Sequence, residues 1–278
     1  FARMQSHGSE ETVRTPDADL PVYSILVPLL DEAHVVPTLI AGLDALDWPR
    51  DRLDVKFLVE AHDEGTRRAL EEHARAAEYE ILTVPPIGPK TKPKALSFAL
   101  PLCRGDLVAV YDAEDRPDPG QLREAHAAFL AGGPKLGCVQ APLVAHPRHG
   151  RFVERLFALE YAALFDGLLP VLAHFDMPLP LGGTSNHFRR VVLEEVGGWD
   201  PYNMTEDADL GIRLKRFGYR AATIRLPTHE ETPPSTPVWL KQRTRWFKGW
   251  LQTLLVHTRD PRRLARELGL AGSIGFLL

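Results

Sequence analysis

The chain has 278 residues, 44% of them hydrophobic and 25% charged, which is ordinary for a globular protein of one large domain or two small ones. Its formal net charge of −4 at pH 7 excludes binding of nucleic acid through bulk positive charge, so its basic clusters must act locally. The two cysteines, Cys103 and Cys138, exclude a disulfide framework and are typical of a reducing compartment.

Residues 1–19 are polar and show no hydrophobic periodicity, so we expect a disordered tail or a cloning remnant there. Four short apolar runs follow, and each predicts a buried strand. They lie within 21–30, 53–66, 79–86 and 105–119, and the second and fourth end in acidic turns. Amphipathic stretches between and after them predict helices within 34–49, 66–77, 92–103 and 120–133.

This alternation of strand and helix predicts an α/β fold whose first half is a parallel sheet. In such sheets ligands bind at the carboxyl ends of the strands. The two acidic turns, around Glu60–Glu64 and Asp112–Asp115, both fall at that edge.

The second half of the chain has a less regular pattern. We expect a strand over 138–146, a long amphipathic helix over 151–175 that Pro170 breaks, and a glycine-rich turn into a strand over 179–190. Two helices are then predicted, a short one within 190–200 and a second that Thr205 opens.

Four constellations of side chains carry chemical information. The first is a cluster of carboxylates, Asp112, Glu114, Asp115 and Asp118, at the end of an apolar strand. Clustered carboxylates repel one another unless a cation or solvent relieves them, and Mg²⁺ or Mn²⁺ prefers such oxygen ligands. These residues alone indicate a divalent metal site or a solvated acidic turn.

The second constellation is a group of lysines, Lys90, Lys92 and Lys94, just before and within the first turn of a helix. Both the lysines and the helix dipole favour an anion there, and phosphate is the natural candidate. The alternative is a set of exposed lysines in a proline-rich loop.

The third constellation is Thr205-Glu206-Asp207 at a helix start. The two acids could be purely structural, because carboxylates are favourable at the first helical positions. An ionised carboxylate held there can also act as a general base.

The fourth constellation is "QRTRW", in which Gln242, Arg245 and Trp246 share one face of a predicted helix. An ordinary amphipathic helix or a nucleic-acid patch would also have this composition. A hydrogen-bonding amide, a cation and a flat ring on one face suit a sugar diphosphate better than a duplex.

Taken together and in this order, the motifs resemble the family 2 glycosyltransferases, and within them the processive, membrane-embedded branch of cellulose synthase and its relatives. The resemblance covers about residues 20–256, and "QRTRW" and "TED" are its most specific parts. It implies a single GT-A domain, a nucleotide-sugar-binding α/β fold whose central mixed, mostly parallel sheet is flanked by helices. It also implies an inverting, metal-dependent transfer from a nucleotide-sugar donor, a UDP-sugar by our reading, to a polysaccharide or glycan acceptor, with no nucleic acid as partner.

The resemblance assigns a role to individual residues of this chain. Asp112 and Glu114 take the position of the metal-binding acids for Mg²⁺ or Mn²⁺, and Asp115 shares or replaces the second of them. Asp207 takes that of the catalytic base, with Glu206 beside it. The implied substrate-binding residues are Glu60, Lys92, Lys94, Gly183, Thr184, Gln242, Arg245 and Trp246, with Lys94 preferred over Lys92 as the lysine near the diphosphate.

One departure concerns the nucleotide. Relatives carry an Asp-Asp-Gly after the second strand, whereas this chain has "VEAHDEGT", with Glu60 nearest the first acid and Asp63 three residues later. This stretch also resembles the phage adsorption protein B-like relatives, so the alternative function is a non-catalytic, membrane-associated reception protein. A glycosidase would also need two carboxylates, but it needs no lysine cluster or phosphate site.

The last segment, 257–278, has a basic run followed by about ten apolar residues, fewer than the roughly 20 that span a bilayer. It is expected either to form a last core helix or to be the basic flank and start of a transmembrane helix. On the second reading, which we prefer, the chain is a cytosolic fragment of a protein at the cytoplasmic face of the inner membrane. The helix over 151–172 is expected to be core or to lie on a membrane surface.

Overall fold

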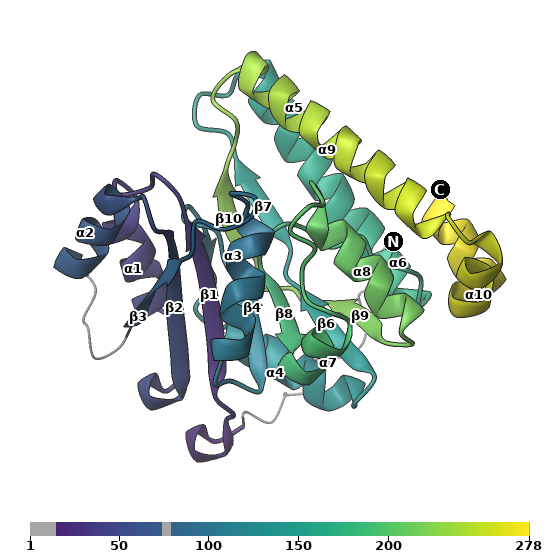
Figure 1. The fold of residues 1–278 in the computed structure, drawn as a ribbon, viewed down its shortest axis with the longest axis horizontal. Helices are drawn as coiled ribbons and strands as arrows, with labels where there is room; N and C mark the ends of the chain where they lie inside the picture. The colour runs from purple at the N-terminus through teal and green to yellow at the C-terminus, as the bar shows by residue number, and fades with distance from the viewer. Residues whose placement is uncertain (1–14, 74–78, 278) are drawn as a thin grey trace.

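The computed structural model describes residues 15–73 and 79–277, and Figure 1 shows their arrangement. Residues 1–14 of the expected tail and the end of the predicted helix 66–77 lie outside these ranges. A seven-stranded sheet forms the centre, in the order β3-β2-β1-β4-β8-β6-β9. Its first four members are parallel and are β1 (Tyr23–Leu29), β2 (Leu53–Glu60), β3 (Tyr79–Val84) and β4 (Leu107–Val110).

The apolar runs that predicted these strands are buried because helices cover both faces of the sheet. In β1 the side chains alternate between two hydrophobic clusters. Tyr23, Ile25 and Val27 pack under α1 (Val36–Asp44) and α4 (Gln121–Gly132). Leu26 points to the opposite face, where α3 (Lys92–Ala99) lies.

The predicted strand at 138–146 is wrong as a single element. The structure divides it at Ala141 and Pro142 into β6 (Leu136–Gln140) and β7 (Leu143–His146), which belong to different sheets. Proline has no N–H for a strand ladder, so the chain changes sheets there. β7 joins a small second sheet with β5 (Arg116–Pro117) and β10 (Thr228–Glu231).

The sheet is mixed beyond its parallel half. β8 (Asn186–Arg189) runs antiparallel to both β4 and β6, and β9 (Arg220–Thr223) runs parallel to β6. The remaining short elements are α2 (Glu64–His73), α7 (Arg190–Glu195) and the 3-10 turns η1 (Asp17–Asp19), η2 (Arg50–Arg52) and η3 (Leu100–Leu102). The predicted α/β fold with a mixed, mostly parallel central sheet is therefore observed.

The long helix is not broken at Pro170. It continues through α5 (Phe152–Tyr161), the π-helical segment η4 (Ala162–Leu168) and α6 (Leu169–His174). A proline inside an α-helix collides with the carbonyl four residues earlier, and the wider π turns directly before Pro170 accommodate its ring. Within the described residues, Phe152–His174 alone is long and apolar enough to cross a membrane, and 22% of its most apolar window is buried.

Three helices close the chain: α8 (Glu206–Arg216), α9 (Thr236–His257) and α10 (Pro261–Leu277). Figure 1 shows α9 running along the edge of the molecule, with α10 folded back at its end. α10 contains a kink at Gly269, whose φ of 68° is the left-handed conformation that glycine adopts readily. Leu264 and Leu268 of α10 are buried.

Candidate active site

A polar cleft of about 360 Å³ lies at the carboxyl ends of β1, β2 and β4, where the fold class predicts a ligand. It brings together five of the residues to which the resemblance gives a role, although they are far apart in the chain. These are Glu60, Lys92, Asp112, Glu114 and Arg245. The cleft also contains Glu32 and Lys90.

Lys92 is the cation at the centre of this group. Its ammonium forms an ion pair with Asp112 and donates a hydrogen bond to the carbonyl of Gly183, at 2.6 Å. Burial would lower the pKa of Lys92, but the negative charges of Asp112 and Glu206 outweigh it and raise that pKa. The lysine is therefore charged and tied to the strand end that carries the acids.

Lys94 lies outside this group, although the sequence favoured it over Lys92. Its ammonium is 2.7 Å from Glu60 and donates to the carbonyl of Pro85 at 3.1 Å. Glu60 therefore reaches the cleft with its charge already paired. Asp63, the other acid of that turn, accepts hydrogen bonds from the backbone N–H groups of Thr66 and Asp31, at 3.0 and 2.6 Å. It stabilises the turn and is occupied by it.

Asp115 stabilises the acidic turn through hydrogen bonds. One of its oxygens accepts hydrogen bonds from the Asp112 backbone N–H, at 2.7 Å, and from the Thr184 hydroxyl. Its other oxygen, Oδ1, is buried without a hydrogen-bond partner. Burial and the charge of Asp112 raise the pKa of Asp115 well above its usual value. Asp115 therefore has a structural role beside Thr184, and one of its carboxylate oxygens has no hydrogen-bond partner.

Burial and mutual repulsion disfavour the ionisation of several carboxyl groups of the site. Burial and neighbouring carboxylates raise the pKa values of Glu32 to about 7, of Glu206 to about 8 and of Glu230 to about 8. The same two causes raise the pKa of Glu114. Carboxylates that repel one another in this way are what a hard divalent cation relieves.

The acidic turn fits a divalent ion that is shared with a substrate. In the described part of the chain, no three His, Cys, Asp or Glu side chains converge on one point. Mg²⁺ is commonly held by one or two carboxylates together with substrate phosphates. Asp112 and Glu114 supply two carboxylates, and Asp115, whose Oδ1 has no partner, is hydrogen-bonded to the Asp112 backbone through its other oxygen.

Asp207 and Glu206 begin α8 next to the glycine-rich turn. Thr205 does not form the expected cap: its hydroxyl is buried and has no hydrogen-bond partner. Asp207 accepts a hydrogen bond from the backbone N–H of Ala208 at 2.8 Å. A Cβ on Gly183 would lie 3.3 Å from the second oxygen of Asp207, so glycine at this position allows the close approach. The glycine-rich turn therefore places Gly183 against Asp207, and it places Thr184 against the acidic turn that contains Asp112 and Asp115.

Helix α9 places Arg245 in the cleft, but Gln242 and Trp246, which were predicted to lie on the same helix face, do not line it. Trp246 is half-buried, and the guanidinium of Arg243 lies 4.4 Å from its ring centroid. At least part of the ring that was expected to stack on a sugar is therefore covered by a neighbour. Gln242 is also half-buried, and its side-chain oxygen has no partner.

Two carboxylates of the site were not predicted as functional. Glu32 follows β1, between the first predicted strand (21–30) and the first predicted helix (34–49). Glu230 lies on β10, a four-residue strand of mostly polar residues that gives no hydrophobic alternation. The four consecutive polar residues 228–231 were the available signal, and they are equally typical of a loop.

The chain resembles known proteins over most of its length. The model of a family described as "Glycosyltransferase like family 2" matches residues 21–249. A Bacillus subtilis protein named as a glycosyltransferase, YdaM, is 27% identical over 83% of this chain and 56% of its own length. A cellulose synthase catalytic subunit (UDP-forming) of Xanthomonas axonopodis pv. citri is 30% identical over 92% of this chain and 35% of its own length. The chain thus spans about half the length of the first of these relatives and about a third of the second.

Solved structures show the same fold. A mannosyltransferase from Pyrobaculum calidifontis, in complex with GDP-Man and Mn²⁺, superposes with a TM-score of 0.68. Its identity is 22%, and the match covers 95% of this chain and 80% of that one. The predicted GT-A fold is therefore confirmed, and the family model, which spans most of the chain, shows that this protein belongs to the glycosyltransferase-like family 2.

Proposed function

We propose that the chain is the catalytic domain of an inverting, metal-dependent glycosyltransferase, which moves a sugar from a nucleotide diphosphate to a growing polysaccharide or glycan. The observation that carries this proposal is the polar cleft itself. It combines the cations Lys92 and Arg245 with the carboxylates Asp112 and Glu114. Asp207, at the start of α8, lies against Gly183, and the Gly183 carbonyl accepts a hydrogen bond from Lys92.

In the proposed reaction, the donor diphosphate lies between Lys92 and Arg245. Asp207 accepts the proton of an acceptor hydroxyl, whose oxygen attacks the anomeric carbon from the face opposite the nucleotide. The bond from the anomeric carbon to the diphosphate oxygen breaks, its electron pair leaves with the nucleotide, and the configuration inverts. Lys92 and Arg245 stabilise the negative charge that develops on the leaving group.

Asp112 and Glu114 would hold Mg²⁺ or Mn²⁺, which when bound neutralises charge on the diphosphate. Glu60, which lines the cleft, is proposed to face the nucleoside. Gly183, Thr184, Gln242 and Trp246 are proposed to line the acceptor side. The cellulose synthase relative named as UDP-forming supports a UDP-sugar, and the neighbour solved with GDP-Man and Mn²⁺ supports a metal.

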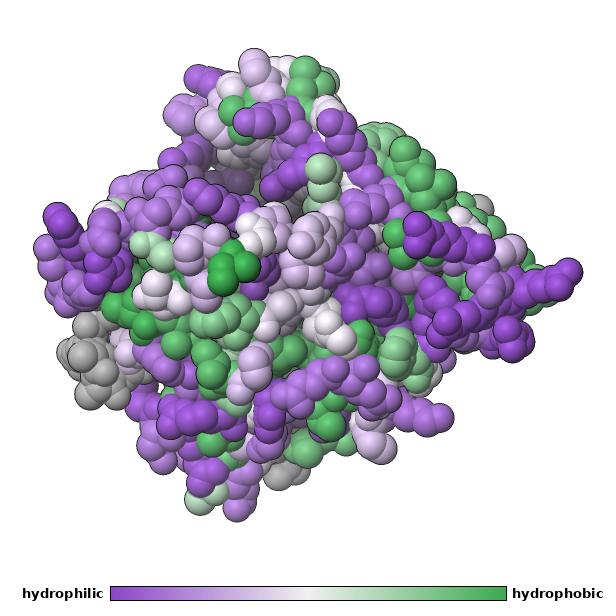
Figure 2. Space-filling model, in the orientation of Figure 1, coloured by the Kyte–Doolittle hydropathy of each residue, from purple (hydrophilic) through white to green (hydrophobic). Residues whose placement is uncertain are grey.

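We further propose that residues 20–256 form the catalytic domain and that 257–278 lead toward the membrane, at its cytoplasmic face. Large apolar side chains are exposed on the outer side of α9, and Figure 2 shows hydrophobic residues gathered along that edge. They are Phe247, Trp250, Leu251, Leu254 and Leu255. Such a helix face is typical of binding at a lipid surface. Among the relatives is a β-monoglucosyldiacylglycerol synthase of Trichormus variabilis, 28% identical over 92% of this chain.

The replacement Asp207→Asn tests the catalytic assignment. Because the amide cannot accept the proton, we expect turnover to fall by about 10²- to 10⁴-fold while UDP still binds. Asp51→Asn, an exposed acid before β2 at the opposite end of the sheet, is the matched control and should turn over normally. Release of UDP or GDP from the nucleotide sugar gives the rate, and normal turnover in Asp207→Asn would refute the role.

The pH dependence of the unaltered protein is the second readout. Burial is the largest cause of a pKa of about 6 for Asp207. Because the base works when deprotonated, we expect kcat to rise with pH through that region and to level off above it. The Glu206 carboxyl beside it means that the measured value belongs to the pair. A rate that falls as pH rises from 5 to 7 would contradict this assignment.

A further inference from the structure

Helix α9 is 22 residues long, and its three buried residues are small or polar: Gly249, Thr253 and His257. They are spaced at i, i+4 and i+8, so they share one face. That face meets the start of α8 and the turn before it, the segment that carries Asp207. We call these three residues and their partners the α8–α9 seam.

Gly249 and Thr253 form the first half of the seam. A Cβ on Gly249 would lie 2.5 Å from the side chain of Thr205 and 2.8 Å from its backbone nitrogen, so the two backbones are in close contact. One turn further, the Thr253 hydroxyl accepts a hydrogen bond from the side-chain amide of Asn203, at 3.1 Å. The other end of that amide accepts the Thr205 backbone N–H at 3.0 Å.

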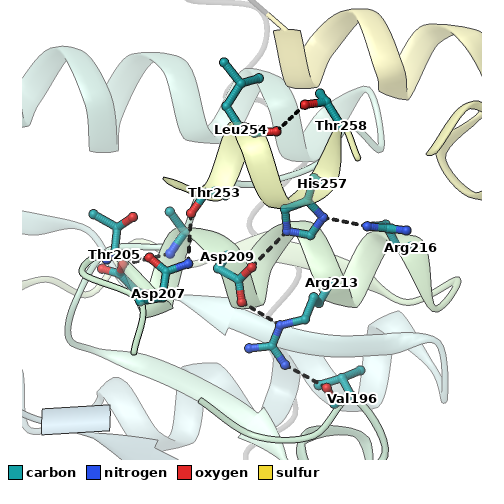
Figure 3. A network of polar contacts seen from close by, with 12 residues as sticks. Val196, Thr205, Asp207, Asp209, Arg213, Arg216, Thr253, Leu254, His257 and Thr258 are labelled. Atoms are coloured by element: carbon teal, nitrogen blue, oxygen red, sulfur yellow. Dashed lines mark hydrogen bonds and ion pairs between the residues drawn. The ribbon is translucent and has the colours of Figure 1, made fainter. Parts of the chain in front are cut away.

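His257 forms the second half, and Figure 3 shows its ring between two partners on α8. Its Nδ1 lies 2.8 Å from the guanidinium of Arg216, and its Nε2 lies 2.9 Å from Asp209. A guanidinium can only donate, so Nδ1 must accept. The ring proton is therefore on Nε2 and is donated to Asp209. The imidazole is 2% exposed and is neutral in this arrangement.

Both α8 partners of His257 are themselves held in place. Asp209 forms an ion pair with Arg213 at 2.6 Å, and Arg213 donates to the carbonyls of Val196 and Gly198, each at 2.7 Å. Arg216 pairs with Glu267 of α10 at 2.6 Å. Burial alone would raise the pKa of Asp209, but the bonds from His257 and Arg213 lower it. The network is fully paired on both sides of the ring.

We propose that Thr253 and His257 are positioning residues, which fix α9 to the first turns of α8 and so hold Arg245 and Asp207 in a fixed position relative to each other. The inference rests on the proposed transferase function for its kinetic consequence. The structural part of the inference, the coupling of α8 to α9, does not depend on that function. The seam differs from an apolar helix interface because it specifies one register through directed hydrogen bonds.

Two replacements of His257 separate this role from simple packing. The amide nitrogen of Gln can occupy the Nε2 position and donate to Asp209. Asn reaches only the Nδ1 position, so it retains the contact with Arg216 and loses Asp209. We expect His257→Asn to lower kcat about tenfold and to change the Kd for UDP with Mn²⁺ less than twofold. It should also speed amide hydrogen exchange in 205–209 and 242–250, and His257→Gln should restore both properties.

Gly249→Ala provides a second test, because its methyl group would push α9 away from Thr205. Gly167→Ala, whose Cβ meets nothing within 4 Å, is the control. Slower turnover and faster exchange in Gly249→Ala alone support the seam. The inference is overturned if His257→Asn leaves kcat and exchange unchanged, or if Gln and Asn are equally damaging. If the unaltered chain shows no turnover, the proposed transferase function is refuted. Hydrogen exchange in the variants would still test the α8–α9 seam.

Discussion

Lys92 and Lys94 show how much a single residue position decides in this site. They lie two apart at the start of α3, so their side chains leave the helix on different sides. Lys92 meets Asp112 in the cleft, whereas Lys94 meets Glu60. The sequence predicted a lysine cluster for an anion, but spacing alone could not tell which lysine reaches the acids. Which lysine reaches the acids depends on the orientation of α3 about its own axis relative to the sheet.

Replacing each lysine by Met should therefore have different effects. Lys92→Met removes the cation proposed to bind the diphosphate, so UDP binding should weaken about 10- to 100-fold. Lys94→Met leaves the buried Glu60 unpaired, which should lower the free energy of unfolding by about 3 kcal/mol. Calorimetric binding and urea unfolding measure the two effects. Equal loss of UDP affinity in both variants would show that the assignment of the two lysines is wrong.

Among the elements, α9 combines a structural and a functional arginine two residues apart. Arg243 pairs with Glu160 of α5 and lies over the rings of Trp246 and Trp239, at 4.4 and 5.8 Å. Arg245 is exposed and lines the cleft. The helix is thus attached to α5 by one arginine and presents the other to the cleft.

We expect Arg245→Met to lower kcat by about 10²-fold, because a cation aimed at the leaving diphosphate is lost. Arg243→Met should instead lower the melting temperature, since its ion pair with Glu160 and its cation–π contact with Phe157 join α9 to α5. Turnover and thermal unfolding of both variants check this. A reversed pattern, with Arg243 affecting turnover alone, would contradict the division of roles.

The elements also show why the sequence predicted one half of the fold better than the other. Long apolar strands alternating with amphipathic helices are local signals, and they predicted β1 to β4 and their helices. In the second half the strands β5, β7 and β10 have two to four residues and pair across more than 80 positions of sequence. No local pattern specifies such pairing. Glu230, which lies on β10, was missed for this reason.

At the scale of the whole molecule, the site and the apolar edge lie on one helix, since α9 carries both Arg245 and the exposed side chains of its outer face. The sequence placed its membrane expectations in 257–278 and in the helix over 151–172, whereas the exposed apolar face of α9 lies between these two segments. Phe247 and Trp250 stand among the charges of "QRTRWFKGW", whereas Leu251, Leu254 and Leu255 follow in "LQTLLVH".

The protein should therefore sediment with vesicles that contain anionic lipid. The triple replacement of Phe247, Leu251 and Leu255 by Ser, which are 78%, 57% and 60% exposed, should abolish this binding. Leu130→Ser, at a residue 63% exposed on α4, is the matched control and should bind as before. Equal sedimentation of all three proteins would show that the face on α9 is not the lipid contact.

The most direct measurement is calorimetric binding of UDP, with and without Mn²⁺, with GDP as the comparison. We predict that UDP binds in a metal-dependent manner, more tightly than GDP, and that Asp112→Ala abolishes the metal dependence while Asp51→Ala does not. Failure of both nucleotides to bind under any of these conditions, or binding that ignores both Mn²⁺ and Asp112, would contradict a metal-dependent nucleotide-sugar site.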